Sequence, residues 1–155
     1  MALNDIRKST KVIFILFFVS FVFLQMYNKL YWPTADLQIG SRIITVEVAG
    51  TLYRQQKGLG GRDDINSTEG MLFPLDMAAR HPVVMRDMRF SIDVVWIREG
   101  VVVDIAPELQ PEPGVGEGQL TRYYPRAEAN AILELPAGKA EEYGIKIGDR
   151  IEQAG

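Results

Sequence analysis

The sequence predicts a β-rich α+β domain, a small closed or half-closed β-barrel with two short helices, preceded by one N-terminal transmembrane helix. Three observations carry this prediction. An apolar run lies near the N-terminus, short runs rich in β-branched residues separated by glycine and proline fill the chain from Ile39 onward, and cysteine is absent. The implied boundaries are 1–33 for a cytoplasmic N-terminus and signal anchor, 34–38 for a tether, and 39–155 for an extracytoplasmic domain.

The N-terminal helix is the first predicted element. The chain from Val12 to Trp32 can supply the about 20 residues that cross a bilayer, although its strictly apolar part ends at Leu24. Basic residues before the run place the N-terminus in the cytoplasm and the domain in the periplasm or outside the cell. A cleaved signal peptide and a buried soluble helix are the alternatives. No small-x-small cleavage site follows Leu24.

The first half of the domain combines a strand, a helix and a turn-rich segment. Residues 42–49 alternate as a half-buried strand does. Thr51 can then cap a short helix over residues 52–57, which Gly58 ends. A turn-rich stretch over residues 60–70 and the apolar residues 71–73 follow.

In the second half of the domain, strands that are neighbours in the sequence are predicted to pair with each other. Residues 83–85 resemble a short strand, and residues 92–97 and 101–105 form a β-hairpin around Gly100. Residues 108–119 form a loop. The chain ends with a strand, a short helix, and a turn and strand, over residues 131–135, 137–143 and 145–151. So many short strands in about 120 residues must protect their edges, which favours a barrel.

Composition excludes several classes of function. The chain has 155 residues, a net charge of -3 and no cysteine. Without cysteine it can have no disulfide framework, thiolate zinc site or cysteine nucleophile. Its mildly acidic balance argues against binding nucleic acid. No phosphate-binding loop, dinucleotide fingerprint or nucleophile elbow occurs, and we expect no cofactor.

Five short segments, in order, carry a resemblance to a known family. They are Gly58-Leu59-Gly60-Gly61-Arg62, Glu69-Gly70-Met71-Leu72-Phe73, Met85-Arg86-Asp87-Met88, Ile92-Asp93-Val94-Val95-Trp96, and a C-terminal signature running from Ala131 to Gly138 and from Gly144 to Asp149. The domain resembles the bacterial and archaeal domain-of-unknown-function family 192. The resemblance implies a fold and an export signal or anchor, but no activity. The chain departs from the family pattern at Ser91, Asp87, Arg86 and Val84.

Charged residues cluster in these segments. The cluster comprises Arg62, Glu69, Arg86, Asp87 and Asp93. Glu69 and Asp93 could act as an acid–base pair on a glycosidic bond. The same charges could instead bind a polar or sugar-like ligand. The plainer interpretation is that Arg62 bridges Glu69 or Asp93 and fastens the turn-rich segment to the barrel.

Three further features are candidate parts of a ligand or metal site. Tyr124, beside the 108–119 loop, could form an aromatic wall of a ligand groove. His81 and Met85 are weak candidates for binding copper(I), and filling the core is the plainer role for Met85. Glu134 stands between Leu133 and Leu135 as a half-buried carboxylate or as part of the solvent face.

These observations favour a non-catalytic module that binds a cell-envelope polysaccharide or a protein partner. A carboxylate-dependent hydrolase of envelope glycan, using Glu69 and Asp93 with Arg62, is the first alternative. An accessory subunit of an envelope complex is the second. We expect the lipid bilayer to be a partner through the segment from Val12 to Trp32, and nucleic acid not to be one.

Overall fold

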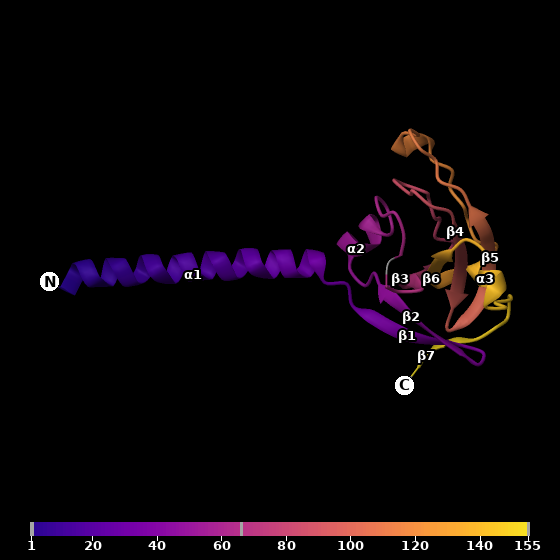
Figure 1. Cartoon of the computed structure of the whole chain (residues 1–155), viewed down its shortest axis with the longest axis horizontal. Coiled ribbons are helices and arrows are strands. Elements are labelled where there is room, and N and C mark those ends of the chain that lie inside the picture. The colour runs from indigo at the N-terminus through magenta and orange to yellow at the C-terminus, as the bar shows by residue number, and fades with distance from the viewer. Residues whose placement is uncertain (1, 66, 155) are drawn as a thin grey trace. The chain divides into compact units, whose positions relative to one another are not determined.

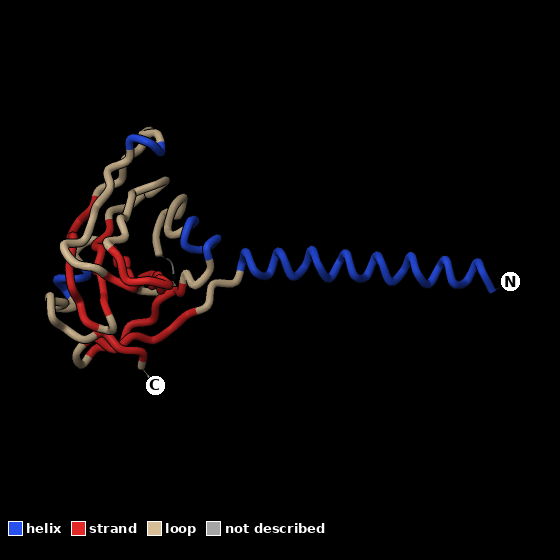
Figure 2. The backbone as a smooth tube through the Cα atoms, turned by 180° about the vertical axis from the view of Figure 1, so that it is seen from behind, coloured by secondary structure: helices blue, strands red, loops and turns tan. Residues whose placement is uncertain are grey.

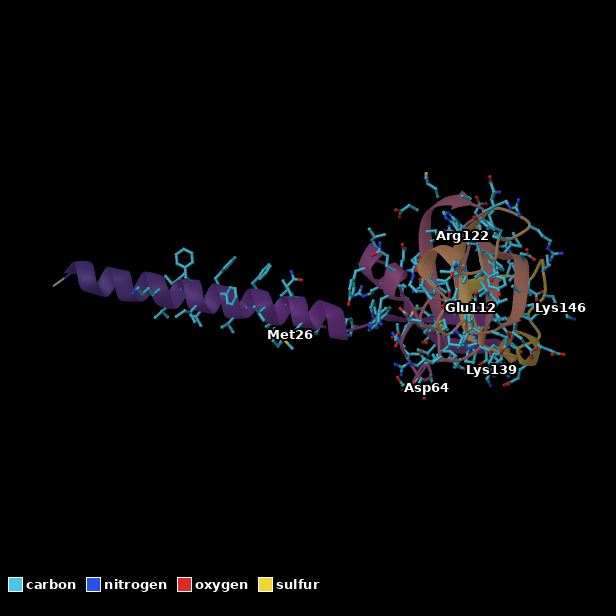
Figure 3. All side chains as sticks on the ribbon, turned by 90° about the horizontal axis from the view of Figure 1, so that it is seen from above. Met26, Asp64, Glu112, Arg122, Lys139 and Lys146 are labelled. Atoms are coloured by element: carbon cyan, nitrogen blue, oxygen red, sulfur yellow. The ribbon has the colours of Figure 1, made fainter. Side chains whose placement is uncertain are left out.

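The computed structural model describes the backbone of residues 2–65 and 67–154, and the side chains of residues 11–27, 31–65 and 67–154. Contacts divide the chain into two units, Met1–Trp32 and Pro33–Gly155. The first unit is a single helix, α1 (Ala2–Leu30), and the second contains all of the strands (Figure 1). Most described side chains along α1 are hydrocarbon (Figure 3).

The predicted transmembrane helix is wrong. Among the residues that the structure describes, no helix is both long and apolar enough to span a bilayer. The physical reason is that the strictly apolar run from Val12 to Leu24 is shorter than the about 20 residues needed, and Gln25 follows it at once. The predicted signal anchor and the single-pass membrane localisation depended on that span, and this finding contradicts them. Contact of residues 12–32 with a lipid bilayer stays a prediction.

The second unit is built on one seven-stranded sheet with strand order β5-β4-β6-β3-β2-β1-β7. All neighbouring strands are antiparallel except β2 and β3, which are parallel and are connected through helix α2 (Leu52–Lys57). The strands are β1 (Thr34–Ile39), β2 (Arg42–Val48), β3 (Gly70–Ala79), β4 (Ile92–Arg98), β5 (Val101–Leu109), β6 (Ala129–Pro136) and β7 (Ile151–Gln153).

The sheet curls into a half-barrel (Figure 2). Its two outer strands meet at one end, where Val101 at the start of β5 bridges Arg150 just before β7. The amide of Val102 donates to the carbonyl of Asp149 there at 2.9 Å. Further along, β5 and β7 are not paired, so the sheet is not a fully closed barrel. The predicted fold class is therefore corrected to a curled, seven-stranded half-barrel with helices, none of which is long and apolar enough among the described residues to span a membrane.

Local sequence signals account for several elements. The helix predicted over residues 52–57 is α2, and the Thr51 side chain accepts a hydrogen bond from the Arg54 amide as a cap should. The predicted hairpin is β4 and β5. Helix α3 (Lys139–Glu142) is shorter than predicted. The loop predicted over residues 108–119 begins two residues later, because residues 108 and 109 end β5, and it includes the 3-10 turn η1 (Glu117–Gln119).

Two segments differ from the sequence interpretation. Residues 34–38, interpreted as a tether, form most of β1, because Leu37 and Ile39 bury their side chains when β1 pairs with β2. Residues 83–85 are not a strand, and only an isolated bridge joins Val83 to Tyr123. Both outcomes depend on pairing between distant segments, which a local pattern does not reveal.

The two faces of the sheet are covered differently. The inner face carries the main hydrophobic core, which joins β1, β2, β4, β5, β6 and β7 with Ala140 of α3 and Ile145. The outer face carries another set of alternating residues, among them Met71, Phe73 and Trp96, all buried. Helix α2 and the segment after β3 lie over part of this outer face, because they line one cavity together with Phe73 and Ile132.

Candidate functional site

A cavity of ≈ 290 Å³ lies on the outer face of the sheet. Side chains from β3, β4 and β6 face it from the sheet, and α2, the turn after it and residues 81–88 complete the wall. The apolar part of the wall includes Leu59, Phe73, Val83, Met88, Ile92 and Ile132. We call this space the Glu134 cavity, because Glu134 of β6 is its one acidic lining residue in the described part of the chain.

Strand alternation places Glu134 in this cavity. Leu133 and Leu135 point to the inner core, so Glu134 between them must point to the outer face. Its cross-strand partners on that face are Met71 of β3 and Val94 of β4, both fully buried. Glu134 is itself only 8% exposed. This burial in apolar surroundings raises the pKa of Glu134 to about 8.

Glu134 is unusual because its buried carboxyl lacks a partner within the protein. Among the residues that the structure describes, no hydrogen bond or salt bridge to the Glu134 side chain is found. Desolvation alone accounts for the raised pKa. Buried carboxyl groups are nearly always paired or hydrogen-bonded, because an unpaired one costs several kcal/mol, on the order of 2–7.

The backbone beneath Glu134 is fixed by a glycine. A Cβ atom on Gly70 would lie 2.6 Å from the carbonyl oxygen of Glu134 and 2.8 Å from Leu135 Cδ2. Both distances are too short for real atoms, so β3 and β6 can come this close only with glycine there. Gly70 belongs to the Glu-Gly-Met-Leu-Phe segment, and this contact is a physical reason for its glycine.

A second glycine fixes the position of Arg86 at the cavity wall. A Cβ on Gly60 would lie 2.9 Å from the Arg86 carbonyl oxygen, and the amide of Gly61 donates to the carbonyl of Asp87 at 2.7 Å. The turn after α2 therefore packs directly on the Arg86 turn. This contact brings two of the resembling segments together, and Asp87 has a left-handed backbone there, with φ of 55°.

The Arg86 side chain is engaged by the loop after β5. Its guanidinium forms a two-pronged ion pair with the carboxylate of Glu117 in η1. This hydrogen bonding raises the pKa of Arg86 and lowers that of Glu117. Figures 1 and 2 show the loop carrying η1 extending from one end of the sheet. The positive charge of Arg86 at the cavity wall is thus neutralised by Glu117, which does not line the cavity.

Two more titratable side chains line the Glu134 cavity, and each has a partner other than Glu134. The Lys57 ammonium donates to the carbonyl of Gly60 at 2.8 Å. The His81 ring nitrogen Nε2 lies 2.8 Å from the carbonyl oxygen of Met77. The cavity wall therefore combines basic side chains that are engaged by other groups with one buried acid.

The two predicted catalytic carboxylates do not enter this cavity, and they are held separately. Glu69 is half-buried; its Oε2 accepts from the Thr45 amide at 3.1 Å and its Oε1 accepts from the Tyr143 hydroxyl at 3.1 Å. Burial, together with this carboxylate, raises the pKa of Tyr143 to about 12. Glu69 thus joins β2 to the end of α3.

Asp93 is buried on the inner face of β4 and is 1% exposed. Its Oδ1 accepts from the Glu108 amide and its Oδ2 from the Ala140 amide, both at 2.8 Å. Ala140 lies in the first turn of α3, whose amides have no partners within the helix. Asp93 thereby fastens α3 and the end of β5 to the sheet. This geometry favours a structural role for Glu69 and Asp93 over an acid–base pair.

The other predicted site residues are dispersed. Arg62 pairs with Glu47 of β2 at 2.7 Å, not with Glu69 or Asp93, so it fastens the turn-rich segment through a different acid. Tyr124 is 52% exposed and does not line the Glu134 cavity. Of the predicted ligand-binding residues, only Arg86 lines it among the residues described.

The two candidate metal ligands, His81 and Met85, lie in different surroundings. Met85 is fully buried, whereas His81 lines the Glu134 cavity and its carbonyl accepts from Trp96 Nε1 at 3.1 Å. Over the described ranges, no three histidine, cysteine, aspartate or glutamate side chains gather as they would around a metal ion. The surface side chains with nitrogen and oxygen tips are intermixed, as around Glu112 and Lys139 (Figure 3).

Sequence reasoning did not select Glu134, although a signal was present. An acid between two leucines in a central strand points to the face opposite them. Whether that face is covered depends on α2 and residues 81–88, which lie far from Glu134 in the sequence. The local pattern therefore left a buried carboxylate and an exposed one as equal alternatives.

Comparisons with known proteins place the fold. The chain resembles a crystal structure of a "putative transcription regulator" from Sinorhizobium meliloti 1021, with a TM-score of 0.70 and 22% identity over 80% of this chain and 96% of that one. It also resembles a protein of unknown function from Novosphingobium aromaticivorans DSM 12444, with a TM-score of 0.65 and 26% identity over 78% of this chain and 84% of that one. No curated protein sequence matches.

The family comparison agrees with the resemblance that the short segments carry. The model of family DUF192, described as "Uncharacterized ACR", matches residues 35–153. That match spans nearly the whole half-barrel, including Gly60, Gly70, Arg86 and Glu134. The chain therefore belongs to domain-of-unknown-function family 192.

Proposed function

We propose that the half-barrel is a non-catalytic binding module that takes a small polar, sugar-like ligand, free or as a unit of a polysaccharide, into the Glu134 cavity. One observation carries this proposal. The Glu134 carboxyl lines the cavity, is 8% exposed, and has no partner among the residues that the structure describes. A buried polar group that the protein leaves unsatisfied is a natural contact for a ligand.

The cavity wall supports a sugar-like ligand. Sugars present apolar C–H faces and hydroxyl groups, and the cavity combines Phe73, Ile92 and Ile132 with the polar residues Gln56 and Glu134. Its ≈ 290 Å³ is near the lower end of ligand cavities, which run from roughly 300 to 1,000 Å³. One sugar unit is therefore a suitable size.

Binding without catalysis is supported by the placement of the acids. Glycoside hydrolysis needs two carboxyl groups facing one substrate. In the described part of the chain, Glu134 is the one acidic residue that lines the cavity. Asp93 and Glu69 are occupied by amide and hydroxyl donors at other places in the fold.

A blocked cavity tests the proposal. Leu75 is half-buried and lines the cavity, so Leu75→Trp should fill it without entering the main core. Ile147→Trp is the matched control, because Ile147 is exposed and lies outside the lining. Isothermal titration calorimetry of the full chain against glucose, glucosamine and N-acetylglucosamine should show saturable binding to the wild type and to Ile147→Trp.

Leu75→Trp should weaken that binding at least about tenfold, because the indole occupies the space of the ligand. Equal binding by Leu75→Trp and the wild type would show that the sugar sits elsewhere. If none of the three sugars binds to the wild type, the proposed function is wrong. Release of products from a chromogenic glycoside would overturn the non-catalytic part.

A further inference from the structure

The charges around Glu134 decide which ligand the cavity prefers. Lys57 of α2, His81 and Arg86 are the basic side chains of the cavity wall, and each of them has a partner other than Glu134. On the neighbouring strands of the same face stand Met71, Val94 and, one strand further, Glu47, which pairs with Arg62. Over the described residues, no cation of the protein therefore neutralises Glu134.

Glu134 is buried before any ligand arrives, and this desolvation raises its pKa to about 8. Below that pH the carboxyl carries a proton instead of a charge. An amine that pairs with it must therefore displace this proton as well as give up its own hydration. The attraction between the two charges in a low dielectric, together with the hydrogen bonds of the ammonium, has to exceed both costs.

Building on the proposed function, we propose that the Glu134 cavity selects a ligand that carries a primary amino group, such as an amino sugar, and that its ammonium pairs with the Glu134 carboxylate. An ammonium supplies both a positive charge and three N–H donors, whereas a hydroxyl supplies one neutral donor. A charge-assisted hydrogen bond is roughly twice as strong as a neutral one. The low dielectric of the cavity increases this difference.

Pairing with an ammonium has a consequence for proton balance. In the free protein near neutral pH, Glu134 holds its proton, because its pKa is about 8. When a charged amine binds, the ionised carboxylate is stabilised, and the proton leaves to the solvent. A neutral hydroxyl ligand leaves the carboxyl protonated. Amine binding should therefore release about one proton, and hydroxyl binding none.

Three matched sugars test the preference. Glucose, glucosamine and N-acetylglucosamine carry a hydroxyl, an amine and a neutral amide at the same carbon. At about pH 6.5, where Glu134 is protonated and the free amine is charged, we expect glucosamine to bind the full chain at least about tenfold more tightly than glucose. Calorimetry in two buffers of different ionisation enthalpy measures the released proton.

Glu134→Gln is the informative variant, because it keeps the shape of the side chain and cannot ionise. It should bind glucosamine and glucose with affinities equal within about threefold and release no proton. Glu141→Gln is the matched control, since Glu141 is exposed on α3 outside the cavity, and it should behave as the wild type. Both variants are first compared by circular dichroism to show that they are folded.

The outcomes separate this inference from the proposed function. Equal binding of glucose and glucosamine by the wild type, lost in Leu75→Trp, would overturn the amine preference and leave the binding module standing. Tight glucosamine binding that survives in Glu134→Gln would place the amine elsewhere and overturn the inference. If none of the three sugars binds, both proposals are wrong.

Discussion

Two carboxyl groups on neighbouring strands, Asp93 of β4 and Glu134 of β6, are both buried but differ in their surroundings. Asp93 points to the inner face, where each of its oxygens accepts a backbone amide. Glu134 points to the outer face and lacks a partner among the described residues. The first is a structural device, since it anchors Glu108 and Ala140. The second is a local conflict, because an acid is buried there without a donor.

Asp93 and Glu134 show what distinguishes an acid with a structural role from an acid that is a candidate for binding a ligand. Burial is similar for both, so burial alone does not identify a site. The difference lies in the donors: β4 faces the first turn of α3, which has free amides to offer, whereas β6 faces apolar side chains and a cavity. Proteins depart from local consistency mainly where function demands it.

The largest effect should follow from removing Asp93. Asp93→Ala leaves the buried amide of Ala140 and the part-buried amide of Glu108 without an acceptor, so we expect a loss of about 3–5 kcal/mol in the free energy of unfolding. Asp93→Asn keeps one acceptor oxygen and should lose roughly half as much. Urea unfolding of the full chain measures both. A loss below about 1 kcal/mol for Asp93→Ala would show that these two hydrogen bonds do not hold α3.

Glu134 should have the opposite effect on stability. Its pKa is about 8 in the folded protein, against the ordinary value of 4.5. Folding therefore favours its protonated form, and its stabilising contribution is complete below about pH 4.5 and is lost as the pH rises to about 8. At pH 7 the wild type should be less stable than at pH 4.5 by about 3 kcal/mol from this group alone.

Glu134→Gln isolates that contribution, because glutamine does not titrate. The difference in unfolding free energy between Glu134→Gln and the wild type should grow as the pH rises from 4.5 to 8, with the variant becoming relatively more stable. Urea unfolding at several pH values measures it. A difference independent of pH would mean that Glu134 is ionised in the folded protein at pH 7.

The smallest effect should come from the ion pair between Arg86 and Glu117. Glu117→Gln weakens the hold on an exposed guanidinium, so the Tm should fall by no more than about 2 °C, and by less at high salt. Arg86 lines the same cavity as Glu134. If the released guanidinium approaches the acid, the pKa of Glu134 falls, and the pH-dependent loss of stability should then be smaller and end at a lower pH.

A matched control for this variant is Glu152→Gln. Glu152 forms an exposed pair with Arg150 at 3.6 Å, away from the Glu134 cavity. It should change the Tm equally little and leave the pH dependence as in the wild type. If Glu117→Gln and Glu152→Gln behave alike at every pH, Arg86 does not influence Glu134.

Local signals predicted the parts of the fold that depend on neighbours in sequence. Thr51 and Gly58 bound α2 as the capping rules require, and the residues around Gly100 form the β4–β5 hairpin. The parts that failed depend on distant contacts or on length. Residues 34–38 become a strand only through β2, and the predicted span from Val12 to Trp32 relied on the polar residues that follow Leu24 to reach the required length.

In the candidate site, too, the sequence predicted some features, and the fold determined the others. Arg86 was selected from the sequence, and its place at the cavity wall depends on Gly60, which lies in another of the five segments. Glu69, Asp93 and Arg62 were grouped because they are charged and lie in neighbouring segments. The fold then separates them: β4 presents Asp93 to the inner face, whereas Arg62 and Glu69 lie in the segment between α2 and β3, and each finds a different partner.

The family, the short strands with their turn glycines, and the alternation that sends Glu134 to the face opposite Leu133 and Leu135 follow from the sequence alone. The tertiary structure adds that this face is covered by α2 and residues 81–88, that the cover leaves a cavity, and that no donor among the described residues reaches the acid. The physical reason is that periodicity sets the direction of a side chain. The hydration and pairing of that side chain depend on segments far away in the sequence.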